Sequence, residues 1–322
     1  MNEFELIRRY FADPHVATDV LVGIGDDGAV LRPAAGRDLI SVIDTQIEGV
    51  HYPRALDARD IGYRAVAVNL SDIAAMGGRP RWMTLALTLR EVEPVWLQEF
   101  SVGLRTAADE FQVSLVGGDT TRGQQTVISI QMTGDVMPDK QLLRSGASNG
   151  DLIYVSGTPG DAAAGLELLQ AGTVTTVAAQ ALVERFRRPS ARVALAQAIA
   201  PLASAAIDLS DGLFGDTHKL LQASGTGGQI DIDALPLSAA LLAEFGLERA
   251  RMLALGGGDD YELCLTLPAE NEAAFNEMAS QHGVQVTCIG AVTAGDNFTC
   301  LIDGAVFDYS DPGYQHFGGA DE

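Results

Sequence analysis

The stretch Ala-Val-Ala-Val-Asn-Leu-Ser-Asp-Ile-Ala-Ala-Met-Gly-Gly, residues 65–78, carries the strongest structural signal in this chain. Apolar residues recur at helical spacing from residue 59 to residue 76, and the Gly77-Gly78 pair is a natural helix stop. The pattern predicts a helix over residues 59–76 with a buried face. Asp72 breaks the pattern, because a carboxylate within an apolar helix is costly unless a counter-charge or a metal ion pairs with it.

Strand-like and helix-like runs alternate on both sides of this helix, which indicates an α/β or α+β protein. Strands are expected at residues 39–43 (ending at Asp44), 82–89, 113–116, 126–136, 152–156, 229–232, 261–267 and 284–289. A further strand is expected to end at residue 207. Further helices are expected at residues 95–111, 162–170, 177–187, 191–200 and 213–223. Residues 137–150 read as a connection, so we expect two domains, residues 1–140 and 150–322.

The composition describes an acidic globular protein. The chain has 322 residues, of which 47% are apolar and 20% charged, and this length suits two domains with proper cores. Lys plus Arg number 21 and Asp plus Glu number 43, so the formal net charge is −22. Such a surface repels a phosphate backbone, which excludes a nucleic-acid binder.

Membrane and secretory signals are missing from the sequence. No run approaches 18 uninterrupted apolar residues, which excludes a membrane span, and residues 1–10 lack the apolar centre of a signal peptide. The three cysteines, Cys264, Cys288 and Cys300, are too widely spaced for a zinc site or a redox pair and read as reduced core residues. We therefore expect a cytoplasmic protein.

The common phosphate-binding loops are excluded by the residues themselves. The only two lysines, Lys140 and Lys219, follow Asp139 and His218, so no Walker A loop is present. The Gly-Ile-Gly of residues 23–25 resembles half of a dinucleotide fingerprint, but two aspartates follow where small residues should open a helix.

Five short segments instead place aspartates among small residues, at strand ends or on a helix. They are Gly-Ile-Gly-Asp-Asp (23–27), Ile-Asp-Thr (43–45), Asn-Leu-Ser-Asp (69–72), Gly-Gly-Asp-Thr-Thr-Arg (117–122) and Ile-Asp-Leu-Ser-Asp-Gly (207–212). Any one of them could be an ordinary turn. Five in a chain with scarcely any lysine favour hard divalent cations such as Mg²⁺, which bridges carboxylates and phosphate oxygens.

These segments, in this order, resemble the thiamine-monophosphate kinase family of the aminoimidazole-ribonucleotide-synthetase-like ATP-binding superfamily. The resemblance extends through Glu-Gly-Val-His (48–51), Arg-Ser-Gly-Ala (144–147), Gly-Gly-Asp-Asp-Tyr-Glu-Leu (257–263) and Gly-Tyr-Gln-His-Phe (313–317), and so covers essentially the whole chain.

The resemblance implies an ATP-dependent phosphorylation of thiamine monophosphate to thiamine diphosphate, assisted by several Mg²⁺ ions. It implies an α+β, two-domain ATP-binding fold, in which the N-terminal domain forms a barrel-like homodimer core with its copy and the C-terminal domain closes over the nucleotide. Carried over position by position, the metal ligands are Asp27, Asp44, Asp72, Asp119, Asp208, Asp211 and Ile43; ATP contacts are Gly118, Asp119, Arg144 and Ser210; and substrate contacts are His51, Asp259 and Tyr314.

Two departures from the family pattern stand out. The residues before Asp44 are usually Ser or Thr but are Val42 and Ile43 here, so only backbone carbonyls could bind a metal at that edge. The usual Glu of the Gly-Gly-Glu-Asp-Tyr-Glu-Leu segment is Asp259, which reaches one methylene less far.

Other functions remain possible on the residues alone. One alternative is another enzyme of the superfamily, acting on a ribonucleotide or on selenide, although no cysteine precedes Cys264 to serve the selenide chemistry. The other is a non-catalytic regulator that binds nucleotide or metal.

Overall fold

A computed structural model describes residues 3–12, 17–311 and 313–314 of the chain. The chain divides into two compact units. Unit 1 comprises residues 1–73 and 78–139, and unit 2 comprises residues 74–77 and 140–322.

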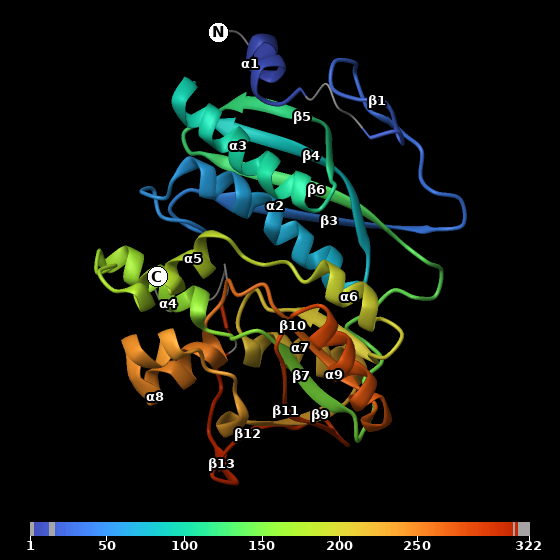
Figure 1. The fold of residues 1–322 in the computed structure, drawn as a ribbon, viewed down its shortest axis with the longest axis vertical. Helices are drawn as coiled ribbons and strands as arrows, with labels where there is room; N and C mark the ends of the chain where they lie inside the picture. Colours follow the sequence, from blue (N-terminus) through green and yellow to red (C-terminus); the bar gives the residue numbers. More distant parts are fainter. Residues whose placement is uncertain (1–2, 13–16, 312, 315–322) are drawn as a thin grey trace. The chain divides into compact units, whose positions relative to one another are not determined.

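Unit 1 is a four-stranded sheet with two long helices on one face (Figure 1). The sheet order is β3-β6-β4-β5, with β4 and β5 parallel and the other neighbours antiparallel. The elements are α1 (Glu3–Tyr10), β1 (Val20–Val22), β2 (Val30–Leu31), β3 (Asp38–Ile47), α2 (Ala58–Ala75), β4 (Arg79–Leu89), α3 (Pro94–Glu110), β5 (Ser114–Arg122) and β6 (Val127–Val136).

Helices α2 and α3 approach each other closely because glycines face the contact. A Cβ on Gly62 would lie 2.1 Å from the carbonyl oxygen of Phe100, and a Cβ on Gly103 would lie 1.8 Å from that of Arg59. The two backbones can therefore pack at a distance that any larger residue would prevent.

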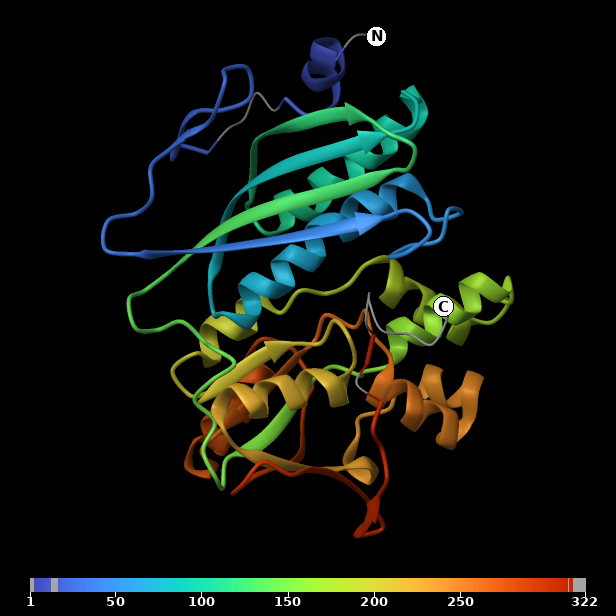
Figure 2. The ribbon, with the colours of Figure 1, turned by 180° about the vertical axis from the view of Figure 1, so that it is seen from behind.

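The opposite face of the sheet lies toward the viewer in Figure 2, in front of both helices. Hydroxyl pairs link neighbouring strands there: Thr45 and Ser129 lie 2.7 Å apart, and Thr88 and Thr121 lie 2.9 Å apart. One face of the sheet thus forms the core with α2 and α3, while the other stays partly exposed.

Two strands run further than their apolar residues predicted. The strand expected to stop at Asp44 continues to Ile47, because β6 pairs with it through the register Ile47↔Val127. The strand expected at residues 113–116 continues as β5 to Arg122, paired with β4. Asp44 and Asp119 therefore lie within strands and not at their ends, since the polar residues are held by ladder hydrogen bonds that apolar patterning does not report.

Unit 2 is a seven-stranded sheet of order β13-β12-β9-β11-β7-β10-β8, antiparallel except for the β9–β12 pair. Its strands are β7 (Leu152–Ser156), β8 (Ala205–Asp208), β9 (Gly227–Asp231), β10 (Leu263–Leu267), β11 (Val286–Thr293), β12 (Phe298–Ile302) and β13 (Ala305–Phe307). Its helices are α4 (Asp161–Ala171), α5 (Val177–Arg187), α6 (Val193–Ile199), α7 (Leu213–Ser224), α8 (Ala239–Gly256) and α9 (Glu272–Gln281).

Unit 2 has two hydrophobic clusters. One joins the sheet to α7, with Ile207, Leu220 and Ile289 fully or almost fully buried. The other joins α4, α5 and α8, which lie together in Figure 1. Cys264 and Cys300 are buried free thiols, as predicted, whereas Cys288 is only half-buried.

No helix in the described part of the chain is long and apolar enough to cross a membrane.

Candidate active site

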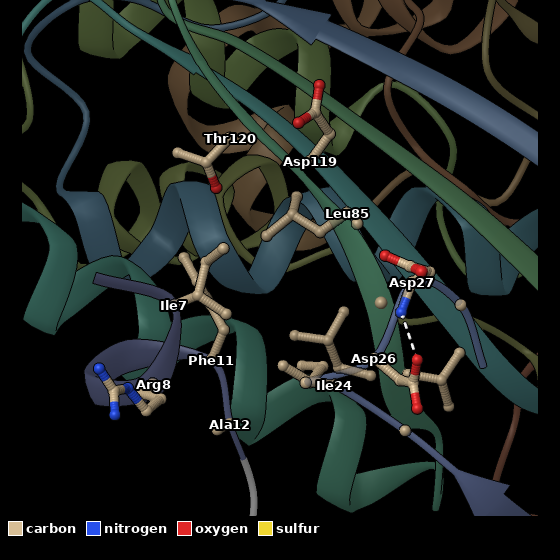
Figure 3. Close-up of a pocket in the computed structure, with 17 residues that line it drawn as sticks. Ile7, Arg8, Phe11, Ala12, Ile24, Asp26, Asp27, Leu85, Asp119 and Thr120 are labelled. Carbon is tan, nitrogen blue, oxygen red and sulfur yellow. Dashed lines mark hydrogen bonds between the residues drawn. The ribbon is translucent and has the colours of Figure 1, made fainter. Parts of the chain in front are cut away.

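In unit 1, three of the residues singled out by sequence line one cavity of about 620 Å³ (Figure 3). They are Asp27, Gly118 and Asp119. The cavity lies between α1, the loop of residues 23–28 and strands β4 and β5. Two apolar side chains form one side of it: Ile7 of α1, and Phe11, the residue that follows this helix.

Glycine is required where β5 passes this cavity. A Cβ on Gly118 would lie 1.9 Å from the carbonyl oxygen of Leu85, and its φ of +154° disfavours other residues. Gly118 therefore lets β5 lie against β4 and places the neighbouring Asp119 at the cavity.

Asp27 and Asp119, two of the three carboxylates that line the cavity, have no lysine or arginine paired with them among the described residues. Asp27 and Asp119 are both exposed, and the backbone N–H of Asp27 donates to Asp26 over 2.8 Å. Figure 3 shows Asp119 pointing away from Ile7 and Phe11, with Thr120 on the other side of β5. An unpaired carboxylate beside a cavity can bind a cation or a polar ligand.

The remaining metal-ligand candidates of unit 1 are not gathered around Asp119. Across the sheet, Asp119 on β5 pairs with Ala86 on β4, Ala86 pairs with Ser129 on β6, and Ser129 pairs with Thr45 on β3. Asp44 precedes Thr45 on β3, and successive side chains alternate between the two faces of a sheet, so Asp44 lies on the face opposite to Asp119. Ile43 is 66% exposed on the face of Thr45. Because β3 is an edge strand, its outward carbonyls are not used by the ladder.

Asp72 lies on α2 between two buried residues, Ser71 and Ile73, but is itself half-buried and not enclosed. No group of three or more His, Cys, Asp or Glu side chains within the described ranges is arranged to hold a metal ion.

His51 is held in a tight turn after β3. The backbone N–H of Ile47 donates to His51 Nδ1 over 3.0 Å, and the His51 N–H donates to the Ile47 carbonyl over 3.0 Å. Since Nδ1 accepts a hydrogen bond, the neutral ring carries its proton on Nε2, which can donate to a ligand.

In unit 2, the segment Ser210-Asp211-Gly212 leads from β8 into α7 and is held by a buried carboxylate. One oxygen of Asp216 accepts the backbone N–H groups of residues 210, 211 and 212 over 3.0, 3.0 and 3.2 Å. Burial raises the pKa of Asp216, while hydrogen bonds and the charge of Lys219 act in the opposite direction. Sequence reasoning missed Asp216, although an acidic residue in the first turn of a predicted helix was a usable signal.

Lys219 is paired with one of the predicted metal ligands. Its Nζ donates to Asp211 Oδ2 over 2.6 Å and to Asp216 Oδ1 over 2.9 Å. The near-absence of lysine was an argument for metal at these aspartates. For Asp211 the argument for a metal is incomplete, because Lys219, one of the two lysines of the chain, forms an ion pair with its carboxylate.

The segment of residues 257–263 gives its three acidic side chains three different environments. Asp260 is buried and accepts the N–H groups of Gly160 and Ala162 at the start of α4 over 2.6 and 3.2 Å. Glu262, also buried, accepts from Arg185 and Arg192. Burial raises the pKa of Asp260 well above its usual range, and its two backbone hydrogen bonds partly oppose this shift.

Asp259, the predicted substrate contact, lies on the surface side of this segment in a left-handed backbone conformation with φ 71°. Its N–H donates to the Ser210 carbonyl over 2.9 Å. Tyr261, also at positive φ, donates its hydroxyl to Asp259 Oδ1 over 3.3 Å. The fold thus brings Asp259 and Ser210 together from distant parts of the sequence.

Tyr314 joins the same group, because its N–H donates to the Asp211 carbonyl over 3.1 Å. The rest of the motif that contains it, residues 315–317, lies outside the described residues. Asp208 is buried in β8 opposite Leu263.

Arg144 is separated from this group. Its carbonyl accepts a hydrogen bond from Ser224, the last residue of α7, whereas Ser210 and Asp211 precede the first turn. A 12-residue helix spans about 18 Å, so the exposed Arg144 lies near the opposite end of α7.

Comparison with known proteins assigns the chain to a family. Residues 25–136 match the family model described as AIR synthase related protein, N-terminal domain, and residues 148–303 match the corresponding C-terminal domain. The thiamine-monophosphate kinase of Salmonella typhimurium is 44% identical over 322 residues, which cover 98% of each chain. This chain belongs to the thiamine-monophosphate kinase family.

Solved structures of the same family have the same fold. The crystal structure of thiamine-monophosphate kinase from Stenotrophomonas maltophilia K279a is 42% identical, with a TM-score of 0.84 over 89% of this chain and 92% of that one. A second structure, AaThiL complexed with AMPPCP and TMP, is 34% identical, with a TM-score of 0.79 over 91% of this chain and 92% of that one. The comparisons confirm the family that the sequence motifs predicted, and they confirm the two-domain α+β fold.

Proposed function

We propose that this chain transfers the γ-phosphoryl group of ATP to thiamine monophosphate, giving thiamine diphosphate and ADP. The observation that carries the proposal is the unit 1 cavity, where Gly118 and Asp119 of the family motif meet Asp27. It is supported by relatives named thiamine-monophosphate kinase and by a family structure complexed with AMPPCP and TMP.

The site residues follow the family motifs. We propose that Gly118, Asp119, Arg144 and Ser210 contact ATP, that His51, Asp259 and Tyr314 contact thiamine monophosphate, and that Asp27, Asp44, Asp72, Asp119, Asp208, Asp211 and the Ile43 carbonyl hold Mg²⁺. The donors are all oxygens, which suits a hard cation, and Asp27 and Asp119 are exposed without an ion pair in the described chain. Mg²⁺, when bound, supplies positive charge between phosphate groups that otherwise repel each other.

The chain's own contribution is positioning. ATP carries roughly four negative charges and the acceptor phosphate roughly two, so transfer requires that they be held in line at short distance. No general base is needed, because the acceptor phosphate, with a second pKa of about 6, is already an anion at pH 7.

The enzyme assay is direct. The full chain, incubated with ATP, thiamine monophosphate and MgCl₂, should form thiamine diphosphate and ADP in equal amounts. Omission of thiamine monophosphate and addition of EDTA are the controls. ADP that forms without thiamine monophosphate, or no thiamine diphosphate at all, would contradict the proposal.

We further propose a homodimer in which unit 1 pairs with its copy to form a barrel-like core, and a C-terminal domain that closes over the nucleotide. Exposed Leu39 and Ile43, 53% and 66% accessible on β3, support an interface there. A monomeric mass in sedimentation equilibrium would exclude the dimer, and unchanged small-angle scattering on adding an ATP analogue would count against closure. The free thiols support a cytoplasmic location, which cell fractionation tests.

His51→Gln should lower kcat/KM by about tenfold, which is the effect expected when one hydrogen bond to a charged group is lost. The N–H of Ile47 occupies Nδ1, so we propose that the hydrogen bond to the acceptor phosphate comes from Nε2. In this variant the rate should still reach a plateau above about pH 7, because the fall in rate at lower pH comes from protonation of the substrate's own phosphate group. A loss near 10⁴-fold with that fall at lower pH abolished would instead identify His51 as a proton acceptor.

Asp259→Asn should raise the KM for thiamine monophosphate by about tenfold or more and leave the KM for ATP nearly unchanged. Asn tolerates the left-handed backbone at φ 71°, so the change removes charge without straining the loop. Asp296→Asn, an exposed aspartate of the same unit, is the matched control. An effect confined to the KM for ATP would move Asp259 to the nucleotide site.

A further inference from the structure

Lys219 forms a bridge between two carboxylates of the segment that leads into α7. Its Nζ lies 2.6 Å from Asp211 Oδ2 and 2.9 Å from Asp216 Oδ1. The side chain of Asp216 is 2% exposed, that of Asp211 is 32% exposed, and that of Lys219 is 40% exposed. The ammonium group therefore lies at the boundary between a buried carboxylate and an accessible one.

The backbone N–H groups of residues 210–212, which lead into α7, are not open to an anionic ligand, because the Asp216 carboxylate accepts all three of them. A phosphate that approached here would meet that carboxylate instead of the positive end of the helix. Lys219 places positive charge directly on the Asp211 carboxylate of this segment.

The ammonium group of Lys219 forms ion pairs with both carboxylates at once, over 2.6 Å to Asp211 and 2.9 Å to Asp216. A fixed positive charge on Asp211 Oδ2 repels a second cation at the same carboxylate.

We infer that Lys219 acts as a built-in cation at Asp211, so that a divalent cation binds this carboxylate only in competition with the lysine ammonium. The inference rests on the proposed function, in which Asp211 is a cation ligand of the ATP complex, and it concerns the chain without nucleotide, where Lys219 pairs with that carboxylate. It makes Lys219 a positioning residue, which fixes the charge and the conformation of the Ser210-Asp211 segment without a metal ion.

The test is a cycle of four full-length proteins: the unmodified chain, Lys219→Met, Asp211→Asn and the double variant. Mn²⁺ is titrated into each, and binding is followed by calorimetry and by electron paramagnetic resonance of the free ion. Met keeps the length of the lysine stem and removes the charge. Lys219→Arg keeps the charge and is the matched control.

Lys219→Met should tighten Mn²⁺ binding at one site by about tenfold, a modest value because solvent screens these half-exposed groups. The double variant should lose this gain, Lys219→Arg should resemble the unmodified chain, and Asp211→Asn alone should change Mn²⁺ binding less than about twofold. Unchanged or weaker Mn²⁺ binding in Lys219→Met would overturn the inference.

Asp211→Asn gives a second, independent reading if Lys219→Met does not fold. A marked loss of Mn²⁺ binding in this single variant would mean that the metal, and not Lys219, holds Asp211 in the unmodified chain, and would also overturn the inference. The phosphoryl-transfer assay on the unmodified chain tests the proposed function separately, because the Mn²⁺ titrations need no thiamine monophosphate.

Discussion

Asp119→Asn is expected to reduce kcat by at least about 10²-fold and to leave the folded state intact. Removing one group that stabilises charge in a transition state typically has an effect of this size. Asp119 lines the unit 1 cavity, is exposed, and has no lysine or arginine paired with it in the described ranges. Asn keeps the shape of the side chain and removes the charge, so the loss should fall on catalysis. Steady-state kinetics and thermal unfolding on the same preparation measure both effects.

Asp38→Asn is the matched control for this variant. Asp38 is an exposed aspartate of the same sheet, at the start of β3, and lies outside the cavity. It should leave kcat within about twofold. Near-normal turnover of the Asp119 variant, or a fall in its melting temperature without ligand, would show that Asp119 has a structural role and no catalytic one.

Glu262→Ala should destabilise the protein by about 3 kcal/mol. The Glu262 side chain is fully buried, and Arg185 and Arg192 donate to it over 2.7 and 2.6 Å, as does the Ser156 hydroxyl over 2.5 Å. Truncation leaves the guanidinium groups of Arg185 and Arg192, whose side chains are only about one-fifth exposed, without their carboxylate. Breaking a buried ion pair in this way is strongly destabilising. For a unit of this size the melting temperature should fall by roughly 6–12 °C.

The control is Glu167→Ala, which removes the carboxylate of an exposed ion pair with Arg249. These side chains are 48% and 56% exposed, and the contact distance is 2.9 Å. Exposed pairs contribute little, so this change should alter stability by less than about 1 kcal/mol. Equal losses of stability in the two variants would show that the large effect of Glu262→Ala does not come from the burial of its ion pairs.

The helices and strands with clear patterning could be predicted closely, and those without it could not. α2 and α5 and strand β7 lie within one residue of the ranges predicted for them, because their apolar spacing or their bounding residues mark them. α8 and α9 were missed. A left-handed glycine, Gly246, interrupts α8, and α9 buries only Phe275 and Ala279, so neither shows a continuous apolar stripe.

The motifs also left the direction of each carboxylate undetermined. Asp44 and Asp119 were both expected at strand ends and among the metal ligands. Pairing with β6 and β4 places them inside strands and on opposite faces of the sheet, because side chains alternate along a strand. Register depends on long-range pairing, which a local motif does not contain.

By itself, the sequence determined the family, the acidic globular character, the two-domain α+β architecture and the residues that the family motifs mark. These properties depend on residue type and spacing, which are read directly along the chain. Only the tertiary structure decided which of the marked aspartates are available to a ligand: Asp119 is open at a cavity, Asp260 caps a helix, and Asp211 is paired with Lys219. The physical reason is that the charge state and partners of a carboxylate depend on burial and on neighbours that are distant in sequence, and the fold alone brings them together.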